Sequence, residues 1–221
     1  QYPFGTDNMG RCEFSRILAG GWVTIGIVLA GSAIVAVIGS LVGLLLGQSS
    51  TAKNVLLDSI MNAVTAIPPV AYLIIFIGIW GNSIPTMMVS LTASLILRMI
   101  KLVKTRTEME MAKAYIMCAV SSGASRFRIL LGHVLPNIGK EIVRFLCLSC
   151  AEMIMAISGF SFIGLTLGDD VIDWGSMLSS ARSYLGMAPM LLFYPILFIF
   201  LSTLSFNILG KKLEKEDRAD A

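Results

Sequence analysis

Long stretches without charged side chains dominate the pattern of polar and apolar positions. Residues 22–48, 59–97 and 183–210 contain no Asp, Glu, Lys or Arg, and between residues 145 and 168 the only charge is Glu152. A helix needs about 20 apolar residues to cross the hydrocarbon core of a bilayer. These stretches therefore predict membrane-spanning helices, and none alternates with the period of two that a membrane barrel requires.

The second of these stretches is too long for one span. Pro68 and Pro69 interrupt it early because proline lacks an amide donor, and the Gly-Asn-Ser-Ile-Pro segment at residues 81–85 predicts a turn. We expect a helical lead-in from about residue 55. The chain thus predicts an all-α membrane protein with five transmembrane helices, at about residues 22–47, 60–80, 84–103, 140–163 and 188–210.

The basic residues predict the orientation of these spans. Five spans place 14 of the 17 Lys and Arg residues, Lys53 among them, on one side, and only Arg11, Arg16 and Arg182 on the other. Because cytoplasmic loops are enriched in Lys and Arg, the loop 104–139 and the tail 211–221 are expected in the cytoplasm. The segment 1–21 and the loop 164–187, with Asp169, Asp170 and Asp173, are then extracytoplasmic. With this orientation and no signal peptide, we expect a further N-terminal span to be missing from the printed chain.

Composition narrows the class of protein further. Hydrophobic residues make up 56% of the 221 residues and charged residues 14%, with a net charge of +3. A soluble domain has roughly a quarter charged residues, and +3 is too small to coat a nucleic-acid backbone. A soluble enzyme, a disordered chain and a nucleic-acid binder are therefore excluded in favour of a multi-pass membrane protein.

Few residues suggest catalysis or metal binding. Cys147 and Cys150 have the spacing of a redox or metal pair, but they lie on an apolar helix without a second pair, so packing is favoured. His133 is the only histidine and cannot build a zinc site alone. Ser161 and His133 also fail as a serine-protease pair, since the predicted spans separate them by about 30 Å. The chain has no phosphate-binding GxxxxGK[ST] loop, and we expect it to bind no cofactor and to be no enzyme.

The predicted cytoplasmic loop contains the most informative segment. Residues 108–122 favour a helix, Gly123 interrupts it, and Ser125 can cap a second helix that runs to about His133 before Pro136 ends it. Two short helices joined at a glycine favour a docking surface for another protein. An amphipathic helix lying on anionic lipid is the alternative.

Four blocks of this sequence form a recognisable series. They are Phe4-Gly-Thr-Asp7 with Gly10-Arg11 and Ser15-Arg16; Ala119-Val-Ser-Ser-Gly123-Ala-Ser with Arg128-Ile-Leu-Leu-Gly-His133-Val-Leu-Pro136-Asn137; Ser158-Gly-Phe-Ser161-Phe-Ile-Gly-Leu165 with Trp174-Gly175 and Met177-Leu178; and Phe206-Asn207 with Leu209-Gly210. These blocks resemble permease subunits of bacterial ABC importers, in the branch that transports dipeptides, oligopeptides and nickel. The second block is similar to the EAA loop of that family, and the others match its N-terminal signature and its second half, in the right order.

Several positions depart from the family pattern. The glutamate that gives the EAA loop its name is Met117 here, and the aspartate that follows Gly-Arg in the N-terminal signature is Cys12. Ile157 replaces an acidic residue that is frequent in the family. Family members also generally have six spans, which agrees with the expected missing N-terminal span.

The resemblance implies a type I importer permease fold in the bacterial inner membrane. It implies as partners a second homologous permease, two ATPase subunits that would carry ATP and magnesium, and an extracytoplasmic substrate-binding protein. The coupling helix would be about residues 111–122, and a side chain at Gly123 would wedge the two helices apart or resist the φ of the bend. The expected ATPase-coupling residues are Met117, Cys118, Ala119, Gly123, Ala124 and Arg128.

The spans contain two further kinds of candidate residue. Gly39, Gly43 and Gly47 form a small-residue stripe for close helix packing. Glu152 is a carboxylate deep in a span and is a functional candidate by default; with Met153 and Ser161 it makes up the expected translocation path. The substrate is nickel, a metal chelate or a short peptide, with a slight preference for the metal from the sulfur-rich surroundings of Glu152. An ion-coupled carrier or channel with a regulatory loop, and a membrane scaffold, are the alternatives.

Overall fold

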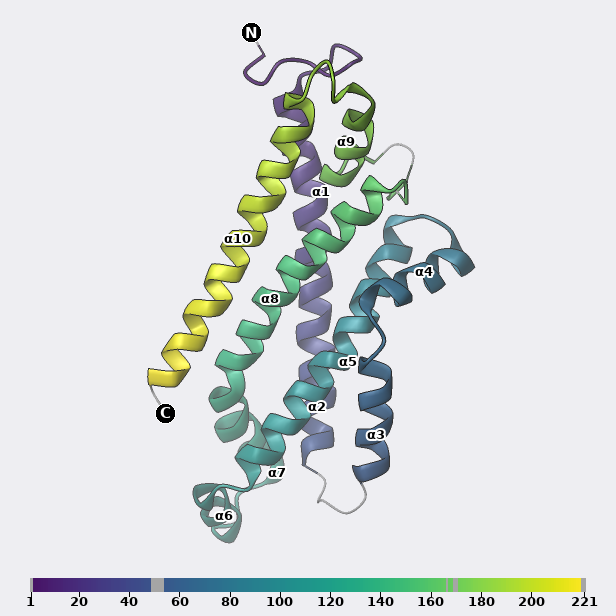
Figure 1. Cartoon of the computed structure of the whole chain (residues 1–221). Helices are drawn as coiled ribbons and strands as arrows, with labels where there is room; N and C mark the ends of the chain where they lie inside the picture. The colour runs from purple at the N-terminus through teal and green to yellow at the C-terminus, as the bar shows by residue number, and fades with distance from the viewer. Residues whose placement is uncertain (1, 49–53, 166, 169–170, 220–221) are drawn as a thin grey trace.

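The computed structural model describes residues 2–48, 54–165, 167–168 and 171–219, and in these residues all regular elements are helices. Lys53, Asp169 and Asp170, which contributed to the predicted orientation, lie outside the described residues. Figure 1 shows long helices side by side, with α9 at one end of the bundle and α6 at the other. The helices are α1 (Glu13–Ile34), η1 (Val35–Gly39), α2 (Ser40–Gly47), α3 (Asn54–Thr65), α4 (Pro69–Trp80), α5 (Ile84–Met111), α6 (Ala114–Ser121), α7 (Arg126–Ile129), η3 (Leu130–Val134), α8 (Leu135–Phe162), α9 (Trp174–Ala181), η4 (Arg182–Tyr184) and α10 (Met190–Ala219).

Within the described residues, four helical segments are long and apolar enough to cross a membrane: Glu13–Gly47, Ile84–Met111, Arg126–Phe162 and Met190–Glu214. Helices α3 and α4 supply a fifth candidate, bent by 78° at the break between them. The break falls at Pro68 and Pro69, and the turn before α5 has Gly81 at a φ of 76° and Ser83 as the N-cap. Both interruptions agree with the prediction from sequence.

The first and third long segments begin well before the predicted spans, and the expected break at Pro136 is wrong. Segments α7, η3 and α8 form one continuous helix, in which Pro136 lies in the first turn of α8 directly after the π-helical turn η3. A proline in a first turn leaves few hydrogen bonds unmade. The expected helix at 108–122 is also divided, because α5 continues to Met111 and α6 begins at Ala114.

Helix α5 packs closely against the first long helix through a row of glycines. A Cβ atom added at Gly43 would lie 2.6 Å from the Cβ of Val103, and one at Gly47 would lie 2.5 Å from the Cβ of Thr107. An added Cβ at Gly39 would overlap the side chain of Met99 in the same way. No side chain fits at these positions, so the two backbones approach as closely as small-residue helix contacts allow.

Helix α9 closes the opposite end of the bundle. The indole Nε1 of Trp174 donates to the backbone oxygen of Ile17 at 3.0 Å, and Gly175 packs against the backbone of Ser158. Asp173 caps α9 by accepting from the backbone N–H groups of Gly175 and Ser176. Burial of this carboxyl raises its pKa, against the opposing effect of the hydrogen bonds that it accepts. These contacts join α9 to both α1 and α8.

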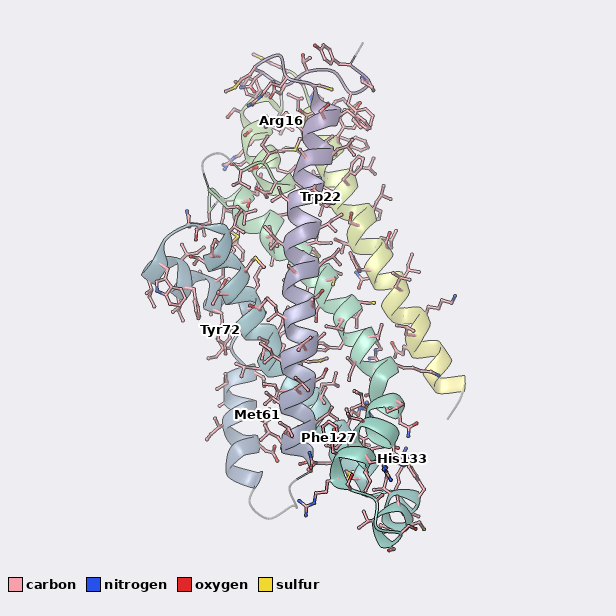
Figure 2. All side chains as sticks on the ribbon, turned by 180° about the vertical axis from the view of Figure 1, so that it is seen from behind. Arg16, Trp22, Met61, Tyr72, Phe127 and His133 are labelled. Carbon is pink, nitrogen blue, oxygen red and sulfur yellow. The ribbon has the colours of Figure 1, made fainter. Side chains whose placement is uncertain are left out.

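The first long helix packs on one side of α5 and α8 and leaves the other side free of it. Seen from behind in Figure 2, the helix that begins with α1 lies across α5 and α8. Figure 1 shows α5 and α8 from the opposite side, in front of that helix, with α10 beside α8 and α4 beside α5. We call this side of α5 and α8 the open face.

The glycine contact gives a prediction for stability. Gly43→Ala should destabilise the folded chain by about 1–3 kcal/mol, since the new Cβ must push α5 away, and it should lower the midpoint of thermal unfolding in detergent. Gly26→Ala is the matched control because nothing lies within 4 Å of a Cβ at that position. An equal loss of stability in both variants would contradict the packing argument.

Candidate functional site

The expected coupling residues lie at the end of the bundle where α6 projects beyond the long helices (Figure 1). Gly123 has a φ of 81°, and its N–H donates to the backbone oxygen of Val120 at 3.0 Å. Nothing lies within 4 Å of a Cβ built on Gly123. The backbone conformation therefore requires glycine here, whereas crowding between the two helices does not. Ser125 caps α7, as expected, by accepting from the N–H of Arg128.

Helix α6 and the start of α7 present apolar side chains outward. Met117 is 58% exposed, Val120 53% and Phe127 71%. Cys118 and Arg128 are also exposed, while Ala119 and Ala124 are half-buried. Clusters of exposed apolar side chains mark surfaces that meet another protein or a membrane. The predicted coupling residues thus lie together on one projecting surface, which we call the α6 surface (residues 114–128).

A buried carboxylate joins the α6 surface to the long helices. Glu110, at the end of α5, accepts from the Tyr115 hydroxyl of α6 and lies 2.7 Å from the Lys113 ammonium and 3.3 Å from the Asn137 amide nitrogen of α8. The Asn137 amide nitrogen also lies 2.8 Å from the Tyr115 hydroxyl oxygen and 2.8 Å from the backbone oxygen of His133. We call these four side chains, Glu110, Lys113, Tyr115 and Asn137, the Glu110 cluster.

The surroundings of the Glu110 cluster are polar and open to one side. Burial and the hydrogen bond to Glu110 both raise the pKa of Tyr115, so its hydroxyl stays protonated at neutral pH. A groove of about 620 Å³ is lined by the cluster and by residues of the first turns of α8. Sequence reasoning missed the cluster, because its members lie up to 27 positions apart and only the fold brings them together.

Ion pairs join α5 to its other neighbours on the same half of the molecule. Lys104 is 1% exposed, and its ammonium lies 2.6 Å from the Asp58 carboxylate of α3 and 2.8 Å from Glu108. Arg106 pairs with Glu141 of α8. A buried lysine must be paired in this way because an isolated buried charge is very costly. Helices α3 and α8 are thus both held to α5 by charged groups.

Glu152 alone among the three path candidates reaches the surface. Met153 is 1% exposed and packs against Gly31, and Ser161 is fully buried beside Gly175 of α9. The Glu152 side chain is 49% exposed, and its carboxylate oxygens lie 3.1 and 3.3 Å from an Arg98 guanidinium nitrogen of α5. The count of basic residues in the sequence assigns Arg98 to the cytoplasmic loop charges. Its position inside a predicted apolar span is the signal that could have indicated a partner for Glu152.

A groove runs along the second half of α5, the half that the predicted orientation places toward the cytoplasm. It has a volume of about 620 Å³ and is lined by Arg98, Lys101 and Arg106 together with Thr65, Thr105 and three apolar residues. We call it the α5 groove. In the part of the chain that the structure describes, no group of three or more His, Cys, Asp or Glu side chains is arranged to hold a metal ion. Cys147 is half-buried, Cys150 is buried, and both are free thiols.

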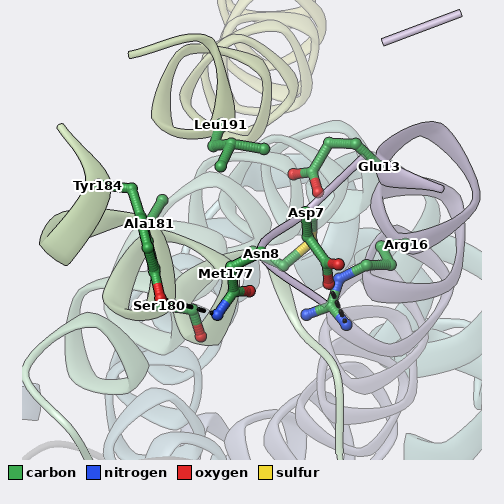
Figure 3. A pocket seen from close by; sticks show the side chains of 9 residues that line it. All are labelled: Asp7, Asn8, Glu13, Arg16, Met177, Ser180, Ala181, Tyr184 and Leu191. Atoms are coloured by element: carbon green, nitrogen blue, oxygen red, sulfur yellow. Dashed lines mark hydrogen bonds and ion pairs between the residues drawn. The ribbon is translucent and has the colours of Figure 1, made fainter. Parts of the chain in front are cut away.

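The N-terminal segment forms a small polar site at the α9 end (Figure 3). Asp7 accepts from the backbone and guanidinium of Arg11, and Arg16 lies 3.3 Å away. Burial raises the pKa of Asp7, but these hydrogen bonds and the charge of Arg16 outweigh it, so the pKa lies below its ordinary value. The adjoining cavity of about 20 Å³ is large enough for about one water molecule. Because Asn8 donates to the Tyr184 hydroxyl at 3.1 Å, this site fastens the N-terminal segment to η4.

Comparison with known proteins places this arrangement in a family. Residues 39–215 match the family described as binding-protein-dependent transport system inner membrane component. The glutathione transport system permease protein GsiD of Pectobacterium atrosepticum is 32% identical over 209 residues, which cover 95% of this chain and 69% of that protein. GsiD of Escherichia coli O157:H7 is 33% identical over 213 residues, covering 96% of this chain and 70% of that protein.

The fold is also similar to that of a solved transporter. A chain of the MetNI methionine ABC transporter, in inward-facing conformations, superposes with a TM-score of 0.68 at 17% sequence identity, covering 90% of this chain and 96% of that chain. The family match spans most of the sequence and includes the α6 surface, the Glu110 cluster and Glu152. The chain therefore belongs to the binding-protein-dependent inner membrane components, as a multi-pass, non-catalytic permease subunit of an ABC importer.

Proposed function

We propose that this chain forms half of a translocation path for peptide-like substrates and that the α6 surface transmits movement from ATPase subunits to α5 and α8. The observation that carries the proposal is the Glu110 cluster. A side chain of α5, one of α6 and one of α8 meet there in one hydrogen-bonded group. A force applied to α6 would therefore act on both long helices together.

The partners in this proposal are a second homologous permease, two ATPase subunits and an extracytoplasmic binding protein. The excess of Lys and Arg on the α6 side supports a cytoplasmic position for α6 and for the C-terminus. The α9 end, with Asp7, Asp173 and the polar site of Figure 3, would then face the binding protein. ATP hydrolysis belongs to the partner subunits.

The chemistry of the α6 surface supports docking through apolar contact. Met117 stands where the family motif has its glutamate, and it is exposed beside Val120. Phe127 and Arg128, in the following helix α7, are exposed as well. A hydrophobic centre with a polar rim is the usual anatomy of a protein interface. For helix α6 itself, this arrangement favours a protein partner over a lipid surface, because an interfacial helix would need a basic polar face. The helix Ala114–Ser121 contains no Lys or Arg, and the two arginines of the α6 surface lie in α7.

Peptide-like substrates are favoured over nickel. The two relatives described above are glutathione transport permeases. The sulfur atoms that suggested a metal complex do not all face one open site, because Cys150 and Met153 are buried inside the chain while Met155 is exposed. We therefore propose glutathione or a short peptide as the substrate.

The bend at Gly123 provides a first test of coupling. Gly123→Val should abolish the stimulation of ATP hydrolysis by the loaded binding protein in the reconstituted transporter, since β-branched residues are strongly disfavoured at positive φ. Gly123→Asn should keep most of the stimulation, because asparagine adopts this conformation far more readily.

This pair of variants separates backbone conformation from side-chain size, as asparagine and valine have similar volumes. Membrane insertion and co-purification with the ATPase subunits are measured in parallel. Normal stimulation in Gly123→Val, or equal loss in both variants, would show that the φ of the bend is not what coupling requires.

The Glu110 cluster provides a second test. Tyr115→Phe removes the hydroxyl that bridges Glu110 and Asn137 while it keeps the ring, and one hydrogen bond of this kind contributes about 0.5–1.5 kcal/mol. Uptake per ATP hydrolysed should fall about two- to tenfold, because α6 would move with less effect on α5 and α8. The matched control is Tyr194→Phe, whose hydroxyl has no hydrogen bond among the described residues. An unchanged ratio of uptake to hydrolysis in Tyr115→Phe would rule out this route of coupling.

A further inference from the structure

The open face of α5 and α8 carries charges at a depth where lipid does not tolerate them. Arg98 lies near the middle of the 28-residue α5. Glu152 lies ten residues before the end of α8, roughly 15 Å along the helix axis. Both side chains remain partly exposed, at 30% and 49%. Charged residues inside membrane-spanning segments face the protein interior or a water-filled cavity. This face is therefore one that water or another protein covers in the assembled transporter.

The charges along the α5 groove do not cancel. Arg98 is balanced by Glu152, and Arg106 is balanced by Glu141. Lys101 also lines the groove, and its side chain is exposed without a carboxylate partner among the residues that the structure describes. The groove thus presents one uncompensated ammonium group next to the Arg98 guanidinium, whose partner Glu152 is not itself a lining residue but lies 3.1 Å from Arg98.

The spacing of these groups on α5 suits one small ligand. Arg98 and Lys101 are three positions apart, so their side chains leave the helix as neighbours on one face, with Thr105 on the following turn. An ammonium and a guanidinium side by side attract carboxylates, and Glu152 adds an acceptor for a substrate amine. The hydroxyls of Thr65 and Thr105 supply further polar contacts.

We propose that the α5 groove is a substrate-binding station in the translocation path, and that Lys101 selects peptides with free carboxylates. The proposal rests on the proposed function, because it assumes that this face borders the path. The ligand class is a small zwitterionic or acidic peptide, with its carboxylate at Lys101 and Arg98 and its amine toward Glu152. Lys101 is then a specificity-determining residue that no motif in the sequence identifies.

A charge series at Lys101 tests this proposal. The complete transporter, with its ATPase subunits and binding protein, is reconstituted in liposomes of neutral lipid, and the initial rate of glutathione uptake is measured. Glutathione carries two carboxylates and one ammonium at neutral pH. Lys101→Arg should keep uptake within about twofold of the parent chain. Lys101→Gln should lower uptake about tenfold, the size expected for one charge-assisted hydrogen bond, and Lys101→Glu should lower it further through repulsion.

The same three substitutions at Lys212, which is also exposed but lies on α10 outside the groove, are the matched controls and should leave uptake unchanged. Equal rates of glutathione uptake in all three Lys101 variants, or an equal loss of uptake in the Gln and Glu variants, would overturn the proposal. The proposal would also be overturned if the Lys101 variants differed in uptake only in liposomes that contain anionic lipid, since the groove would then bind a lipid headgroup. If the parent chain imports no glutathione or other peptide, the proposed function itself fails, and that result is distinct from equal uptake by the Lys101 variants in a working importer.

Discussion

The contact between the glycines of the first long helix and α5 sets the position of α5. The other parts of this permease depend on that helix. Gly39, Gly43 and Gly47 leave no room for a Cβ atom, so α5 lies directly against the backbone of its neighbour. This close packing has little help from the hydrophobic effect inside a membrane, where lipid is as apolar as the helix surface, and it relies on complementary shape. Once this side of α5 is occupied, its other sides can face α3, α8 and the open groove.

The polar residues of α5 show how one helix can serve three purposes in an apolar chain. Lys104 is buried and paired with Asp58 and Glu108, which holds α3 in place. Glu110 is buried at the end of the helix and receives α6. Arg98 and Lys101 remain accessible on the open face. Since an unpaired charge is costly in the membrane, each of these residues has either a partner in the chain or access to the groove.

The sequence predicted much of this fold but not the cluster that carries the proposed coupling. The uncharged stretches predicted the helices, and local chemistry predicted the breaks at Pro68 and Gly81 and the cap at Ser125, because those features depend on a few adjacent residues. The prediction that the helix ends at Pro136 was wrong, because this proline directly follows a π-helical turn and the helix continues through it. The pairs Arg98–Glu152 and Tyr115–Glu110 could not be predicted, because they depend on how two helices are rotated against one another.

The proposed coupling and the proposed binding station are connected by a single rigid element. About 12 residues of uninterrupted α5 separate Arg98 from Glu110, roughly 18 Å at 1.5 Å per residue. A helix of this length transmits a tilt without unfolding, so a displacement of α6 at the Glu110 cluster would move Arg98 and Lys101 together. Glu152, on α8, is joined to the same cluster through Asn137. If α5 and α8 move by different amounts, the Arg98–Glu152 pair must lengthen, and its two charges would become free for the carboxylate and amine of a peptide. The ion pair would then compete with the substrate, so that movement of α6 controls binding in the α5 groove.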